Sequence, residues 1–166
     1  LVLAVLAVAV LNTQAQDMFE KGTQLFKFGF GVNGVGVPVE VSYEKGIIED
    51  FLTEGLVLGI GANVGYYGYK EEFPSMSGTY SWKYTNMIVA ARALGHYSLI
   101  DNLDTYAGLV LGYNVASAKY DGPNAGLIPS PSVGGLVFGG LVGARYEFNP
   151  KLGIYAEAGY SISYLN

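Results

Sequence analysis

The chain has 166 residues, enough for one domain; only 14% of them are charged, while 24 are glycine and 14 are tyrosine. Average soluble domains carry roughly 25% charged residues, so the composition argues against an ordinary cytosolic protein. The formal net charge is −5 and no basic patch is present, which disfavours nucleic acid as a partner. The lack of cysteine excludes disulfides and thiol chemistry.

The first eleven residues form an apolar run that is too short to cross a membrane as a helix. Small residues follow at Thr13 and Ala15, so we expect residues 1–15 to be a secretory signal peptide that is cleaved after Ala15. The usual Met and basic residues are absent, so the sequence is expected to begin within the signal. Residues 16–22 then form a short N-terminal segment, and residues 23–166 form the folded domain. A buried core helix is the alternative for the apolar run.

Two kinds of side chain alternate along most of the folded domain. From Val35 to Tyr43, valine and tyrosine at odd positions alternate with glycine, proline, glutamate and serine. A period of two indicates β-strands, because successive side chains of a strand point to opposite faces. The pattern predicts seven strands, at residues 24–32, 35–44, 55–69, 80–97, 105–118, 133–148 and 152–165.

The connections between these strands differ in length. Asn33-Gly34 predicts a two-residue hairpin, because both residues tolerate positive φ. The longer segment Lys45–Glu54 contains Ile47, Ile48, Phe51 and Leu52, which hint at one helical turn on a membrane surface. Breaker residues or short polar segments indicate the other connections, at residues 70–79, 98–104, 119–132 and 149–151.

The chemistry of the two faces indicates where the sheet lies. Between Leu56 and Tyr66 one face carries Leu, Ile, Ala, Val and Tyr, and the other carries mainly Gly and Asn. A soluble sheet would turn more charge towards water, whereas an apolar outer face with a small polar inner face is typical of outer-membrane barrels. We therefore expect an all-β, antiparallel, up-and-down transmembrane β-barrel. Outward aromatic residues near strand ends fit the interfacial girdles of such barrels.

Loop lengths and strand number extend this prediction. Such barrels have short periplasmic turns and long external loops, so residues 70–79 and 119–132 are expected outside and residues 98–104 and 149–151 in the periplasm. Single-chain bacterial barrels have an even number of strands, and an unpaired strand edge is costly in hydrocarbon. We therefore expect seven of eight strands here, with an eighth of about 9–11 residues after Asn166. Strands 24–32 and 152–165 should flank a gap one strand wide.

Few charged residues fall on the inward parity of the predicted strands. They are Glu40, Arg92, Arg145, Glu147 and Glu157. The interior of an eight-stranded barrel is just wide enough for side chains, and buried charges there must be paired. We therefore expect a structural network, with Arg145 and Glu157 as one ion pair. A gated ion or solute path, or a ligand or catalytic role, is the alternative.

His96 is the single histidine of the chain and lies at the predicted periplasmic rim. One histidine without cysteine cannot form a metal site, and a structural role is favoured over a Ser–His–acid arrangement. The motif Gly59-x-Gly61 and the pair Gly139-Gly140 fall inside predicted strands rather than in a strand–turn–helix phosphate loop. There they relieve crowding or allow bends.

Three segments, Leu103–Asn114, Phe138–Pro150 and Leu152–Leu165, resemble the small outer-membrane β-barrel family of OmpA/OmpX-like eight-stranded proteins. The resemblance covers nearly all of residues 23–166. It implies a barrel more than a function, because the family includes structural anchors, adhesion proteins, narrow pores and a few enzymes that act on lipid.

The expected function is that of a non-enzymatic, monomeric barrel in the bacterial outer membrane, exported through the periplasm and without a cofactor. It would contact membrane lipids and present external loops for envelope integrity or surface interaction with a partner that the sequence does not identify. The alternatives are a narrow porin-like channel, a lipid-modifying barrel enzyme and a soluble barrel that binds a hydrophobic ligand.

Overall fold

The structure is a computed structural model that describes residues 6–10, 18–32, 36–75, 78–149 and 151–159. In this part of the chain every long element is a β-strand, and one 3-10 turn, η1 (Ala125–Leu127), lies between two of them. The strands are β1 (Leu6–Val10), β2 (Gln24–Phe30), β3 (Val39–Ile48), β4 (Leu56–Ser75), β5 (Gly78–Ile100), β6 (Leu103–Asp121), β7 (Ser132–Asn149) and β8 (Leu152–Gly159). Within these residues no helix has the length and apolar character to cross a bilayer.

All strand pairs are antiparallel, and neighbours in sequence are neighbours in the sheet. Because β1 pairs with both β2 and β8, the hydrogen-bonded order closes on itself. The predicted all-β, antiparallel, up-and-down arrangement is confirmed, and each of the seven predicted strands has a counterpart in β2 to β8. The predicted Asn33-Gly34 hairpin lies outside the described residues.

Strand β1 occupies the position at which the sequence predicts a gap. Its residues Leu6–Ala9 pair with Leu152–Tyr155 of β8, and Val8–Val10 pair with Leu25–Lys27 of β2. Strands β2 and β8 therefore stand one strand apart, as expected, and the intervening strand comes from the start of the chain. These residues belong to the stretch that the sequence predicts to be a signal peptide.

The predicted loop at residues 70–79 is wrong. Strands β4 and β5 continue through it to Ser75 and from Gly78, in unbroken register from Leu56↔Tyr97 to Ser75↔Gly78. Aromatic rings pair across β4 and β5 in this stretch. Such cross-strand pairs stabilise a sheet in spite of turn-favouring residues such as Pro74.

The predicted helical turn within Lys45–Glu54 is also wrong. Strand β3 continues to Ile48, with a register shift between Gly46 and Ile48, because its backbone groups pair with β4. The connection then turns through Asp50 and Leu52, both at positive φ, and the Asp50 side chain accepts a hydrogen bond from the N–H of Gly55 at 2.8 Å. The longest predicted loop, residues 119–132, is shorter than expected because β6 runs to Asp121.

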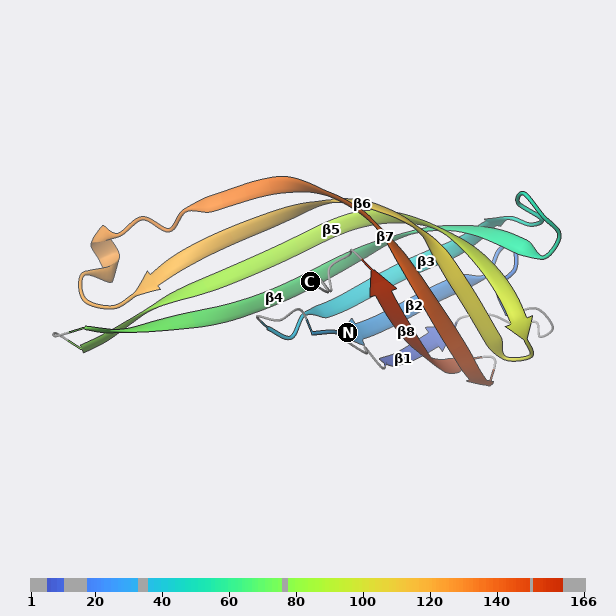
Figure 1. Ribbon diagram of the computed structural model, residues 1–166, viewed down its shortest axis with the longest axis horizontal. Coiled ribbons are helices and arrows are strands. Elements are labelled where there is room, and N and C mark those ends of the chain that lie inside the picture. The colour runs from blue at the N-terminus through green and yellow to red at the C-terminus, as the bar shows by residue number, and fades with distance from the viewer. Residues whose placement is uncertain (1–5, 11–17, 33–35, 76–77, 150, 160–166) are drawn as a thin grey trace.

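The strands differ greatly in length, and this shapes the molecule. Strands β4 to β7 have 18 to 23 residues each, whereas β2, β3 and β8 have 7 to 10. Figure 1 shows the long strands projecting on the left beyond the ends of the short ones, with the segment between β6 and β7, which contains η1, at their tips. We call the part of β4, β5 and β6 beyond Tyr66, Met87 and Val115 the extension.

Burial alternates along the strands with the predicted period of two. In β2, for example, Leu25 and Lys27 are buried while Phe26 and Phe28 are exposed. The buried side of the sheet holds most of the charged groups described below, and the exposed side is apolar. The core of this fold is therefore the interior of the curled sheet.

Candidate functional site

The interior contains a dense ionic network, which is the candidate functional site. The part of the network that lies nearer the extension, which we call the upper part, centres on the carboxylate of Glu157 in β8. Glu157 Oε1 accepts hydrogen bonds from Lys27 Nζ of β2 at 2.5 Å and from Arg92 Nη2 of β5 at 2.7 Å. The hydroxyl of Tyr106 in β6 donates to the same oxygen at 2.9 Å. Four strands thus meet at one carboxylate.

Arg92 connects this carboxylate with two others from β3. Its guanidinium lies 3.5 Å from Glu40 Oε1 and 3.8 Å from Glu44 Oε2. The amide of Asn63 in β4 also donates to Glu40 Oε1 at 3.2 Å. Arg92 is almost fully buried, so its charge is balanced by several partners inside the protein rather than by solvent.

The lower part of the network centres on His96 of β5. Its Nε2 lies 2.7 Å from Glu44 Oε1, and its Nδ1 lies 2.9 Å from Asp104 Oδ2. The ring of Phe19, which precedes β2, stacks on the imidazole with a centroid distance of 3.7 Å and an interplanar angle of 16°. Tyr106 lies against His96 at 4.9 Å. Both ring nitrogens are therefore engaged by carboxylates.

Arg145 of β7 completes the lower part. Its Nη2 lies 3.4 Å from Asp104 Oδ2 and 3.1 Å from Glu147 Oε1, and it donates to the carbonyl oxygen of Met18 at 2.7 Å. The last contact attaches the segment Met18–Thr23 to the sheet. Backbone hydrogen bonds from Gly22 N to Gly46 O and from Gly46 N to Thr23 O secure the other end of this segment.

Glycines in the strands make room for these groups. A Cβ on Gly59 would lie 2.8 Å from Glu44 Oε1 and 3.0 Å from the ring of Phe19. A Cβ on Gly46 would lie 2.0 Å from the carbonyl oxygen of Glu20. Both glycines sit in strands, where close approach of other groups excludes a side chain.

The structure brings together the five inward charges that the sequence singled out, but it pairs them differently. Glu40, Arg92 and Glu157 belong to the upper part of the network, and Arg145 and Glu147 to the lower part. The predicted Arg145–Glu157 ion pair is wrong: within the described residues each makes its ion pairs with other side chains. In register Arg145 faces Tyr155 and Glu157 faces Gly143, so the two side chains lie in different rows.

Four members of the network were not among the predicted charges. They are Lys27, Glu44, His96 and Asp104. Lys27 shares the inward parity with Gly29 in the predicted strand, and the parity of Glu40 and Ser42 extends to Glu44, so alternation alone could have found both. Asp104 was assigned to a turn that is shorter in the structure, and His96 was expected to be structural but without defined partners.

The inner face changes character in the extension. Aromatic rings dominate it beside the carboxylate of Glu71: Tyr69 stacks on Tyr84 with centroids 4.7 Å apart, and Phe73 stacks on Tyr80 at 5.4 Å. Trp82 meets Tyr120 of β6 edge-on at 5.4 Å. Burial raises the pKa of the Tyr69 hydroxyl above its usual value. The rings remain partly exposed, so this aromatic face is both the packing of the extension and a surface open to contact.

The outer face of the extension is polar. Lys70, Lys83 and Lys119 stand side by side in one row of three strands. Lys70 bonds to Glu72 Oε1 at 2.6 Å, and Lys83 bonds to Asp121. These lysines hold the pKa of both exposed carboxyls below the usual range.

Among the described residues, no group of three or more His, Cys, Asp or Glu is arranged to hold a metal ion.

Comparison of the chain with protein-family models, with curated proteins and with solved structures finds no match.

Proposed function

We propose that this protein is a non-enzymatic β-barrel of the bacterial outer membrane that anchors in the bilayer and presents the extension outside the cell. The observation that carries the proposal is the outward face of the sheet. Large apolar side chains are exposed on it throughout β2 to β8, among them Phe28 at 56%, Leu111 at 57% and Phe138 at 66%. A continuous apolar surface of this kind is unfavourable in water and favourable against lipid.

The height of this surface matches a bilayer. In β4, β5 and β6 the outward residues between the rows Leu56↔Tyr97↔Thr105 and Tyr66↔Met87↔Val115 carry no charge. Each of these stretches has 11 residues, and a tilted transmembrane strand needs about 9–11. Beyond the upper row the outward residues become Gly68, Thr85 and Ser117, followed by the three lysines. The change in polarity would mark the outer surface of the membrane.

The interior supports an anchor over a channel. The charged groups inside are paired with one another, and the Phe19 ring lies on His96 at the end opposite the extension. His96 also argues against a Ser–His–acid enzyme, because both of its ring nitrogens face carboxylates rather than a serine. The resemblance to OmpA/OmpX-like barrels supports the same reading, in which the aromatic face and the tip loops of the extension contact an external partner or stabilise the envelope.

Membrane fractionation and gel mobility test the proposal. Expressed with its N-terminal segment in a Gram-negative bacterium, the protein should sediment with outer membranes and require detergent for release. Before boiling it should migrate differently on a denaturing gel than after boiling, because a closed barrel resists unfolding. Recovery as a soluble periplasmic protein would contradict the proposal, and steady conductance in planar bilayers would favour the channel.

Single cysteines then test the orientation, since the chain has none of its own. Lys83→Cys in the extension should react with a membrane-impermeant maleimide on intact cells. Asn102→Cys, in the β5–β6 turn at the other end, should react only after permeabilisation. The reverse labelling pattern would invert the proposed topology.

A further inference from the structure

The outward face is not uniformly convex, because an apolar groove of about 750 Å³ crosses β3 to β7. Two adjacent rows of outward residues form it, Lys45↔Ile60↔Ala93↔Leu109 and Tyr43↔Ala62↔Ala91↔Leu111↔Phe138. A volume of this size lies within the range of pockets that bind small molecules, roughly 300–1,000 Å³.

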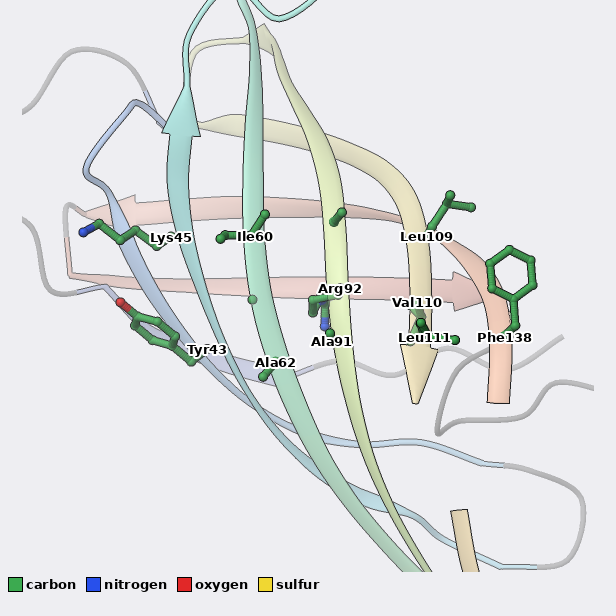
Figure 2. A pocket seen from close by; sticks show the side chains of 12 residues that line it. Tyr43, Lys45, Ile60, Ala62, Ala91, Arg92, Leu109, Val110, Leu111 and Phe138 are labelled. Carbon is green, nitrogen blue, oxygen red and sulfur yellow. The ribbon is translucent and has the colours of Figure 1, made fainter. Parts of the chain in front are cut away.

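The floor of the groove consists of small side chains and its walls of large ones. Ala62 of β4 and Ala91 and Ala93 of β5 lie in the middle, with Leu109, Leu111 and Phe138 on one side. Figure 2 shows Tyr43 and Lys45, both of β3, on the other side of Ala62 and Ala91, and Ile60 on the same strand as Ala62. In the next row towards the extension, Val64 and Val89 take the place of alanine, so the depression does not continue into that row.

One wall is held in position by its own contacts. The ring of Tyr43 packs against Phe26 of β2 with centroids 4.8 Å apart, and its hydroxyl donates to Gln24 Oε1 at 3.1 Å. A fixed wall lowers the entropic cost of binding, because the side chain is already ordered before the ligand arrives. The groove is therefore a preformed feature of the outer surface.

Two charged residues line the groove: Arg92 is buried and makes its ion pairs inside the sheet, whereas Lys45 is exposed. Its side chain is exposed on the outward face, two rows inside the lower edge of the apolar band, and within the described residues it makes no ion pair. A lysine on the lipid-facing side of a barrel is unfavourable unless its ammonium reaches the interface or a counter-charge. An apolar groove with one exposed, unpaired cation at its side is complementary to a molecule with a hydrocarbon chain and an anionic head.

We propose that this groove binds one anionic phospholipid, with an acyl chain over Ala62, Ala91 and Ala93 and the phosphate at the ammonium of Lys45. The inference rests on the proposed membrane location, since only there would such a lipid be the natural neighbour of this face. Lys45 lies three residues before β3 ends at Ile48, near the end of the barrel that is opposite the extension. The lipid would thus belong to the periplasmic leaflet.

Native mass spectrometry of the detergent-solubilised barrel tests the proposal with phosphatidylglycerol and phosphatidylcholine as probes. The wild-type protein should retain one phosphatidylglycerol molecule with an affinity about tenfold higher than that for phosphatidylcholine, which corresponds to about 1.4 kcal/mol. Lys45→Gln should abolish this preference, and Ala93→Leu, which fills the floor, should weaken binding of both lipids. Ala107→Leu, an outward alanine of β6 outside the groove, should behave as the wild type.

The gel mobility of each variant is also measured before and after boiling. This measurement separates the proposed lipid site from the proposed membrane location. If all proteins form heat-modifiable barrels but Lys45→Gln and Ala93→Leu bind both lipids as the wild type does, the lipid site is refuted and the membrane location stands. If the wild type forms no heat-modifiable barrel, the proposed function fails. Loss of a dimer peak in Ala93→Leu, without any change in bound lipid, would assign the groove to a second copy of this chain and overturn the lipid site.

Discussion

At the scale of single residues, the interior depends on Glu157, which meets Lys27, Arg92 and Tyr106 through one carboxylate oxygen. Glu157→Gln keeps the shape of the side chain and removes its charge, so Lys27 and Arg92 lose the nearer of the two carboxylates that they share, Glu157 and Glu44. We expect a loss of about 3–5 kcal/mol in the free energy of unfolding, the usual cost of breaking a buried pair. Urea titration of the refolded protein in detergent measures it.

The matched control is Glu72→Gln. Glu72 also bonds to a lysine, Lys70, but this pair lies on the exposed outer face of the extension. Exposed pairs contribute little because solvent screens them, so this substitution should leave the urea midpoint unchanged. Equal effects of the two substitutions would mean that the interior of the barrel is hydrated and the Glu157 contacts are weak.

Phe19 gives a second prediction at this scale. Its buried ring stacks on His96, and Met18 beside it accepts a hydrogen bond from Arg145. Phe19→Ala should therefore cost about 3–5 kcal/mol of stability, as for other buried phenylalanines, because it leaves a cavity over the imidazole. Leu52→Ala, at a position that is 87% exposed, is the control and should have no effect. An unchanged denaturation midpoint in Phe19→Ala would show that the segment Met18–Thr23 is not seated in the barrel.

At the scale of elements, the register of β5 and β6 depends on a glycine. A Cβ on Gly108 would lie 2.0 Å from the carbonyl oxygen of Ala93 and 2.8 Å from the Cα of Leu94, both part of the β5 backbone. Gly108→Ala should push the two strands apart and destabilise the barrel by about 1–3 kcal/mol, the usual cost of overpacking. Gly135→Ala in β7, where a Cβ meets nothing within 4 Å, should be neutral in the same urea titration.

The extension also belongs to this scale. Its strands are stabilised by rings that stack across them. Its outer face is charged, whereas the outer face of the rest of the barrel is apolar apart from Lys45. The same alternation of side chains thus serves two environments. Below the row of Tyr66 the apolar residues point outward, and above it they point inward, which agrees with the proposal that the sheet leaves a bilayer for water at this row.

At the scale of the whole molecule, closure of the barrel depends on which strand lies between β2 and β8. Strand β1 fills it, yet the same residues have the character of a signal peptide, whose removal after Ala15 would take Leu6–Val10 away. We expect the mature protein to begin at Gln16, as intact mass measurement and N-terminal sequencing would reveal. If the protein lies in the outer membrane, as proposed, another strand with the direction of β1 must then pair with β2 and β8, because unpaired edges are costly in lipid.

Cross-linking is the companion measurement. Ala7 faces Ile154 in the register of β1 and β8, so Ala7→Cys with Ile154→Cys should form a disulfide only if β1 remains in the barrel. A cross-linked mature protein that retains Leu6–Val10 would contradict cleavage and make β1 a permanent strand.

Alternation along the sequence was sufficient to predict strands where β2 to β8 lie and the two faces of the sheet, but it missed β1 and the continuation of β4 and β5 through residues 70–75 and 78–79. The period of two is a local property, since the geometry of an extended backbone sends neighbouring side chains to opposite sides whatever the rest of the chain does. For this reason Glu40 and Arg92 could be placed on the inward side before any tertiary structure was known.

Only the tertiary structure decided which groups meet. Glu157 of β8 reaches Lys27 of β2 past the intervening β1, and His96 joins carboxylates from β3 and β6. The curvature of the closed sheet and the length of each side chain set such contacts, and neither is contained in the parity of a strand. The groove likewise forms where alanines of β4 and β5 happen to align in register with large residues of β3, β6 and β7. Alignment of strands is a property of the whole sheet, because it depends on every turn and bulge that precedes it.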